Sequence, residues 1–240
     1  MKGQWNDYHF IPTNDEKPVL KRDAIFIPMP DPDTILFLRQ IITLTMLSVA
    51  SYFDIKTRRI DDRIWLIFAI PGIVLYFLAP LPSFATIFFL VIGIIIGMTW
   101  FFTRVFGQAD GLAIIALAIV FPIFDNMPVS VLVALATTVL LGLFGMLYNT
   151  IYNISDMLHG NLFLGINEKP HRKILAFLTM HRKRSYEKFV IPTQTGDKFS
   201  FHFKPNPDED FTNDFTGYVS SAFPLVPFML VTLVAYLAIF

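Results

Sequence analysis

The chain has 240 residues, of which 54% are hydrophobic and 16% are charged, and its formal net charge is zero. Soluble domains carry about 25% charged residues, so this composition points away from an ordinary soluble protein. A zero net charge gives no global attraction to nucleic acid, and no nucleic-acid partner is expected. The chain has no cysteine, which excludes disulfides and cysteine-based zinc or nucleophilic sites.

Long apolar runs follow a polar segment at residues 1–33. About 20 mainly apolar residues are needed for a helix to cross a bilayer. Six runs are candidates: 34–53, 64–79, 83–102, 112–124, 129–148 and 218–240. We predict an all-α polytopic membrane protein with six transmembrane helices, in preference to a soluble protein with buried helices. The run 112–124 is short, so we expect neighbouring helices to shield it from lipid.

Basic residues predict the topology. With six spans, one side of the membrane carries five Lys and Arg residues and the other carries fourteen of the nineteen. The second side holds 54–63, 103–111 and 149–217, and the positive-inside rule makes it cytoplasmic. Both termini are then extracytoplasmic, with 1–33 as a polar extension. The protein is expected in the cell membrane.

Residues 149–217 are too many for a structureless connection, so we predict a small α+β cytoplasmic domain between the fifth and sixth spans. Residues 150–160 favour a helical continuation of the fifth span. Phenylalanines alternate with polar residues over 198–203, which indicates a strand with one buried face, and Gly196-Asp197 favours a hairpin turn before it. The predicted division is therefore 1–33, 34–148, 149–217 and 218–240.

A basic stretch in this predicted domain flanks the apolar residues 174–180. Such a pattern indicates a helix lying near the anionic inner leaflet. His171 and His181 lie among Lys and Arg, where headgroup contact or solvation is expected. The five histidines show no i, i+4 pair of the metal-ligand kind, so no metal or other cofactor is expected.

Asp54 and Asp110 lie beside apolar runs, at the predicted cytoplasmic ends of the first and fourth spans. Ionisable residues there are candidates for function. Two carboxylates that share a site cannot both ionise easily and share one proton, which suits acid–base hydrolysis without a metal. Other roles stay open: Asp110 as a helix cap, and Asp54 as a solvated ion-pair partner of Lys56 or Arg58. Asp61 and Asp62 compete with Asp54, and Asp62 suits the N-cap of the second span.

Two other kinds of chemistry are weaker predictions. The chain contains no G-x-S-x-G motif, and a dyad of Ser51 and Lys56 has no further support. A proton- or ion-coupled transporter that uses the same carboxylates is the main alternative function. Against it, no internal repeat is detectable, and the carboxylates lie at the membrane edge instead of the midplane.

The chain resembles the archaeal preflagellin peptidases, relatives of the type IV prepilin peptidases. The resemblance depends on residues 50–60, with the sequence ASYFDIKTRRI, and on 107–110, with the sequence GQAD, which fits the G-x-G-D motif in its G-x-hydrophobic-D form. It covers roughly residues 35–240, including the six-span plan and the segment 224–228. The resemblance implies that Asp54 and Asp110 are the two catalytic aspartates.

It also implies an aspartyl endopeptidase that removes short basic leader peptides from preflagellins and pilin-like precursors at the cytoplasmic face. Bacterial relatives often carry a cysteine-containing domain after the first span and also methylate their product. Here the connection 54–63 is ten residues long and cysteine is absent, so no N-methylation is expected. Asp61, Asp62 and the acidic cluster 208–210 are candidates for docking the basic leader.

Overall fold

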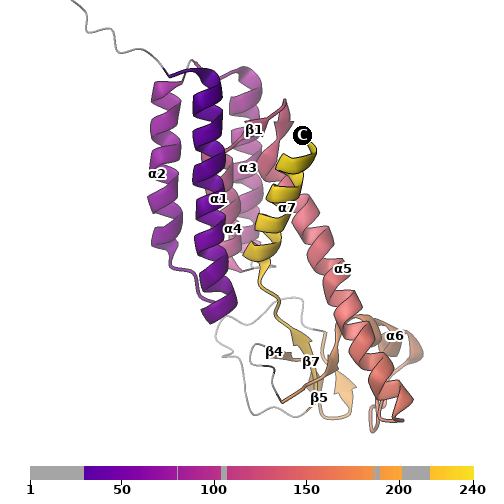
Figure 1. Ribbon diagram of the computed structural model, residues 1–240. Coiled ribbons are helices and arrows are strands. Elements are labelled where there is room, and N and C mark those ends of the chain that lie inside the picture. The colour runs from indigo at the N-terminus through magenta and orange to yellow at the C-terminus, as the bar shows by residue number, and fades with distance from the viewer. Residues whose placement is uncertain (1–29, 80, 104–106, 186, 188–189, 202–216) are drawn as a thin grey trace, which may run out of the picture.

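The structure is a computed structural model, and it describes residues 30–240 apart from 80, 104–106, 186, 188–189 and 202–216 (Figure 1). The described residues form helices α1 Pro32–Thr57, α2 Asp62–Leu78, α3 Phe84–Thr103, α4 Gln108–Val120, α5 Val129–Leu158, α6 Pro170–Thr179 and α7 Leu225–Ile239. The strands are β1 Ile123–Phe124, β2 Met127–Pro128, β3 His181–Arg182, β4 Val190–Pro192, β5 Gln194–Thr195, β6 Lys198–Phe199 and β7 Tyr218–Ser221. The protein is therefore mostly helical, with small strands.

Helices α1, α3 and α5 are long and apolar enough to cross a membrane, whereas α4 and α7 are apolar but shorter. Of the six predicted spans, three thus meet this criterion within the described residues. The outward faces of α2 and α3 are apolar as well, with Leu66, Phe77 and Ile95 all more than half exposed. Apolar side chains on the outside of a helix bundle are suited to lipid contact, and these helices identify a membrane protein.

Helix α4 is the central helix of the bundle. It packs against α1, α2, α3 and α5, and most of its residues are buried although it has only 13. The expected shielding of the run 112–124 is confirmed. The run ends earlier than expected, however, because Pro122 follows the helix and residues 123–124 pair with β2. Asp125 and Asn126 both have positive φ in that turn, as two-residue hairpins require.

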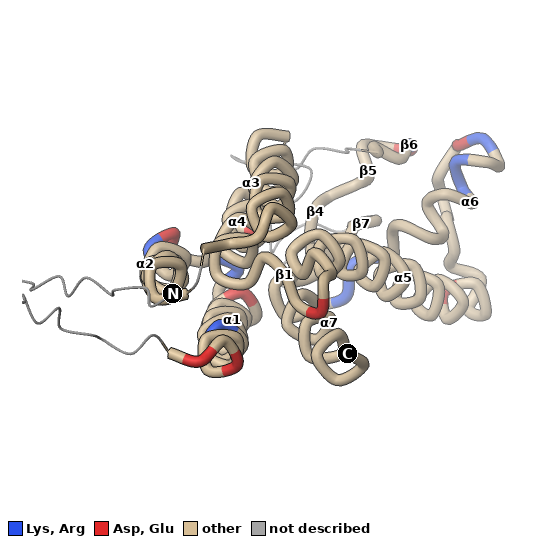
Figure 2. The backbone as a smooth tube through the Cα atoms, turned by 90° about the horizontal axis from the view of Figure 1, so that it is seen from above, with Lys and Arg blue, Asp and Glu red and all other residues tan. Residues whose placement is uncertain are grey.

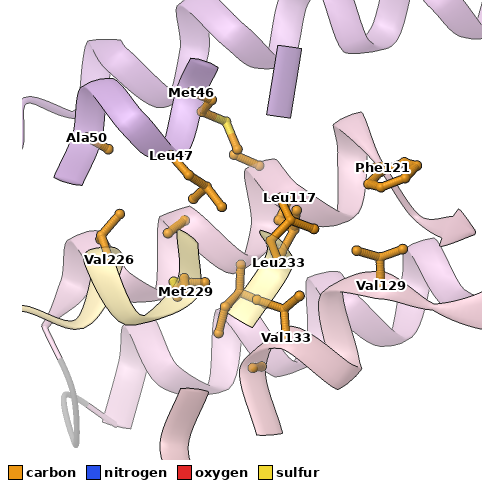
Figure 3. Packing of buried hydrophobic residues seen from close by; sticks show 14 of the residues in the cluster. Met46, Leu47, Ala50, Leu117, Phe121, Val129, Val133, Val226, Met229 and Leu233 are labelled. Carbon is orange, nitrogen blue, oxygen red and sulfur yellow. The ribbon is translucent and has the colours of Figure 1, made fainter. Parts of the chain in front are cut away.

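The main core lies where α1, α4, α5 and α7 meet (Figure 3). Met46 and Leu47 of α1 point toward Leu117 of α4 and Leu233 of α7, and all four are fully buried. Burying each such side chain contributes roughly 1.5–3 kcal/mol relative to water. This core fixes the first, fourth and last predicted spans against one another.

A three-stranded antiparallel sheet precedes α7, with β7 between β3 and β4. The prediction that residues 218–240 form one helix is wrong at its start, because 218–221 pair as β7 and α7 begins at Leu225. The hairpin at Gly196-Asp197 is confirmed by the pairing of β5 with β6. Strand β6 covers 198–199, and residues 202–203 of the expected strand lie outside the described residues.

Helix α5 continues to Leu158, as expected for residues 150–160. The expectation that His181 contacts lipid headgroups or solvent is wrong, since its ring is fully buried. Nδ1 lies 2.8 Å from Asn149 Oδ1 of α5, and Nε2 lies 2.7 Å from Glu187 Oε1. These two contacts hold the segment after α6 against α5. The Lys and Arg residues next to His181 in the sequence do not indicate that its ring has buried partners.

Candidate active site

Asp54 is buried near the C-terminal end of α1. Its Oδ2 accepts the backbone N–H of Val226 at 3.1 Å, in the first turn of α7. The first turn of a helix has backbone N–H groups without intrahelical partners, and it is the positive end of the helix dipole. Asp54 therefore joins α1 to α7 by satisfying one of those N–H groups.

Arg58 caps α1 in the left-handed conformation, with φ 55° and ψ 18°. This conformation is uncommon for a residue with a side chain, and it turns the chain sharply after Asp54. Arg58 Nη1 lies 3.7 Å from Asp54 Oδ1, and the side chain is 15% exposed. Burial lowers the pKa of the Arg58 guanidinium, while the charges of Asp54 and Asp110 act in the opposite direction.

Asp110 is half-buried in the first turn of α4. Its Oδ2 accepts the backbone N–H of Gly107 at 2.8 Å, which is the carboxylate half of a capping box. Gly107 has an extended backbone, with φ −67°, so the glycine is not needed there for a turn. A Cβ at Gly107 would instead lie 2.9 Å from Asp110 Oδ2, so glycine leaves room for the carboxylate.

Gly111 positions Asp110 by letting α4 approach α3 closely. A Cβ built on Gly111 would lie 2.7 Å from the carbonyl oxygen of Gly97 and 2.7 Å from the backbone nitrogen of Phe101. Real Cβ atoms do not approach so closely. The residue that follows Asp110 thus determines how near the N-terminal end of α4 lies to α3.

Asp54 and Asp110 come from different helices but lie at the same end of the bundle, where α1 ends and α4 and α7 begin (Figure 1). They are within electrostatic reach of each other and of Arg58. Each carboxylate also accepts a backbone N–H at a helix N-terminus, so the alternatives of a cap and an ion pair both exist in the structure. The arrangement brings two carboxylates and one guanidinium together at the end of an apolar bundle.

The other candidates lie elsewhere or have another role. Asp61, not Asp62 as expected, is the N-cap of α2, and its Oδ1 accepts the Arg63 N–H at 2.9 Å. The cluster 208–210 lies outside the described residues. Ser51 is buried, whereas exposed Lys56 donates to the Tyr52 hydroxyl at 3.1 Å, so these two do not form a dyad.

Arg39 holds the opposite end of α4. It is buried, and its Nη1 donates to the Val120 carbonyl at 2.6 Å while its guanidinium lies 4.3 Å from the centre of the Tyr76 ring. The C-terminal carbonyls of a helix are the negative end of its dipole, which a cation stabilises. With Asp110 at one end and Arg39 at the other, α4 has a favourable charge at both ends.

Three features of this site had little or no signal in the sequence. The hydrogen bond from the Val226 N–H to Asp54 involves a backbone group, so no residue type predicts it. Only Pro224, the N-cap of α7, indicates that a helix begins nearby. The role of Arg58 had a partial signal, since it lies four residues after Asp54. The tight α3–α4 contact had a weak signal in the glycines at 93 and 97 of α3, which recur at helical spacing.

Residues 41–146 match the model of the type IV leader peptidase family. This match confirms the resemblance to the prepilin and preflagellin peptidases. The matched region is somewhat less than half of the chain, and it contains both Asp54 and Asp110. This region of the chain is therefore similar to peptidases of that family, which act on leader peptides. No curated protein matches the chain.

Among the residues that the structure describes, no group of three or more His, Cys, Asp or Glu side chains is placed to hold a metal ion.

Proposed function

We propose that the chain is an aspartyl leader peptidase in which Asp54 and Asp110 activate water at the cytoplasmic end of the bundle. The observation that supports this most is their placement: two carboxylates from separate helices, within electrostatic reach of each other, inside the region that matches the leader peptidase family. A structural cap alone needs only one carboxylate at each helix end, with no reason for both to share a neighbourhood.

The reaction follows from general acid–base chemistry. One carboxylate of the pair takes a proton from a water molecule, and the water oxygen adds to the carbonyl carbon of the scissile peptide. The other carboxyl group is protonated and donates a hydrogen bond to the carbonyl oxygen, which stabilises the tetrahedral intermediate. Proton transfer to the leaving nitrogen accompanies cleavage of the C–N bond, and the pair again shares one proton.

Arg58 and the helix ends tune this pair. The Val226 N–H holds Asp54 at 3.1 Å, and the Gly107 N–H holds Asp110 at 2.8 Å, so both carboxylates have fixed orientations. Arg58, 3.7 Å from Asp54, supplies a positive charge that limits the repulsion between them.

The substrates that fit are preflagellin or other pilin-like precursors whose short basic leader precedes a hydrophobic helix. The hydrophobic helix would lie in the bilayer beside the bundle, which places the scissile bond at the membrane edge. Fourteen of the nineteen Lys and Arg residues favour the cytoplasm for this edge and the opposite side for both termini. Cleavage without N-methylation remains the prediction for this chain.

Cleavage of a precursor in membranes tests the proposal. Asp54→Asn and Asp110→Asn should each abolish cleavage, because an amide is neither a base nor an acid here. The control is Asp125→Asn, in the β1–β2 turn, where positive φ suits asparagine. Full activity in either site variant would refute the aspartyl mechanism. Ion-coupled uptake without any cleavage by the unsubstituted protein would favour the transporter.

A further inference from the structure

Helix α5 carries an apolar stripe beyond the length that a membrane crossing needs. Its 30 residues span roughly 45 Å at about 1.5 Å per residue, against a hydrocarbon core of about 30 Å. Exposed apolar residues nevertheless continue to its C-terminal end, with Ile151 58% and Leu158 78% exposed. Figure 1 shows α5 inclined to the other helices, and its last third lies past the ends of α4 and α7.

Helix α6, which packs beside α5, carries exposed apolar side chains of its own. Ile174 of α6 is 66% exposed and Leu175 is exposed beside it. Ala176, in contrast, is buried in a second apolar cluster with Ile166, Met180, Phe199 and Tyr218. A shallow groove of about 240 Å³ adjoins them, lined by Phe163, Lys173, Ile174, Phe177 and Leu178. A water-exposed domain rarely leaves large aliphatic side chains exposed next to an apolar groove.

The contact between α6 and α5 is fixed by buried amides. Asn153 Nδ2 donates to the carbonyls of Phe177 at 2.8 Å and Met180 at 2.6 Å. Asn149 Nδ2 donates to the Leu178 carbonyl at 3.2 Å. Because α5 orients α6 through these bonds, the two helices and their exposed faces are held in a fixed relation to each other.

Basic residues border this surface. Lys169 and His171 are exposed and Lys173 lines the groove, whereas the nearby acid Glu168 is paired with Arg172 at 2.7 Å. In Figure 2, Lys and Arg colour the beginning of α6, which lies beside the outer part of α5 and away from the bundle. The lysines thus leave an excess of positive charge around exposed aliphatic side chains.

We propose that the exposed faces of α6 and the last third of α5, the α5–α6 surface, bind the anionic lipid headgroups of the membrane that the bundle spans. Apolar residues enter the boundary between headgroups and acyl chains while lysines contact phosphates, as in interfacial amphipathic helices. The α5 part of this surface continues the lipid-facing stripe of that helix, which favours the bilayer over a separate protein as the partner. Contact with lipid would hold the small domain, including β7, at a fixed height beneath the bundle.

The absence of cysteine permits a direct test on the full chain in nanodiscs. An environment-sensitive fluorophore is attached to Ile174→Cys and, as the matched control, to Thr195→Cys at an exposed position of β5. Discs contain phosphatidylcholine alone or with phosphatidylglycerol, and a nitroxide on the lipid acts as quencher. The label at position 174 should be quenched at least several-fold more than the label at 195, and more strongly in anionic discs.

Charge and oligomer controls complete the experiment. Exchanging both Lys169 and Lys173 for Gln should remove the difference between anionic and neutral discs while leaving part of the quenching, because the apolar contact remains. Equal quenching at 174 and 195 would overturn the proposal. So would protection of position 174 that rises with protein concentration in detergent, since that result would identify a second copy of the chain as the partner.

Discussion

Replacing Gly111 with Ala perturbs the site without touching either carboxylate. The new Cβ would lie 2.7 Å from both the Gly97 oxygen and the Phe101 nitrogen, and ordinary contact begins at 3.4 Å. Both atoms belong to the α3 backbone and cannot rotate away. We therefore expect α3 and α4 to separate by about 0.7 Å at this point, the difference between those distances.

The expected cost has two components. Overpacking of this kind destabilises a protein by about 1–3 kcal/mol, and the exchange of a helical glycine for alanine offsets about 0.5–1 kcal/mol of that. A catalytic group that moves by about 1 Å can lose on the order of a hundredfold in rate. Because Asp110 precedes Gly111, we expect a tenfold to hundredfold loss of cleavage, on the order of that estimate, together with a net destabilisation of about 0–2.5 kcal/mol.

Gly142→Ala is the matched control, since a Cβ there meets no atom within 4 Å. Rates of precursor cleavage and thermal unfolding would be measured for both variants in the same lipid. Gly142→Ala should retain full activity and unfold at the same temperature or slightly above. If Gly111→Ala retained normal activity and stability, the tight α3–α4 contact would not position Asp110, and the reasoning would be wrong.

Two further predictions concern charges away from the aspartates. Arg39→Leu leaves the Val120 carbonyl without its donor, so the unfolding temperature should fall by an amount equivalent to about 1.5–3 kcal/mol, while an unchanged temperature would show that Arg39 does not hold α4. Burial raises the pKa of Glu187, but hydrogen bonds from His181, the Arg184 N–H and Tyr148 outweigh it and leave the pKa below the ordinary 4.5. Its stabilisation is therefore present above pH 4.5 and is lost as the pH falls through the lowered value. Thermal unfolding against pH should show an acid limb that Glu187→Gln reduces, and an identical limb in the variant would refute this assignment.

The helices of the bundle could be predicted because their apolar runs are long and local in sequence. The same runs could not show where α7 begins, since residues 218–221 carry no charge and lead directly into the apolar run. They form β7 because His181–Arg182 and Val190–Pro192 provide pairing partners, and these lie 25 or more residues earlier in the chain. Partners so distant in sequence leave no periodic signal.

For the candidate site, too, the features local in sequence could be predicted and the long-range contacts could not. The positions of Asp54 and Asp110 at helix ends followed from the apolar runs beside them, and their pairing followed from a count of spans. The acceptor role of Asp54 toward α7 could not be predicted, because it depends on a backbone N–H that is 172 residues away. The prediction for His181 was wrong because it depended on local sequence. Its basic neighbours indicated a surface position, whereas the ring is buried and contacts Asn149 and Glu187.

The most direct test of the aspartate pair is the initial rate of precursor cleavage by Asp54→Asn, Asp110→Asn and the double variant, with equal amounts of folded protein. Residues that act as one catalytic unit have strongly non-additive effects. We predict that each single variant loses as much activity as the double variant. Losses that multiply in the double variant, or substantial cleavage by either single variant, would contradict a shared catalytic role for the two carboxylates.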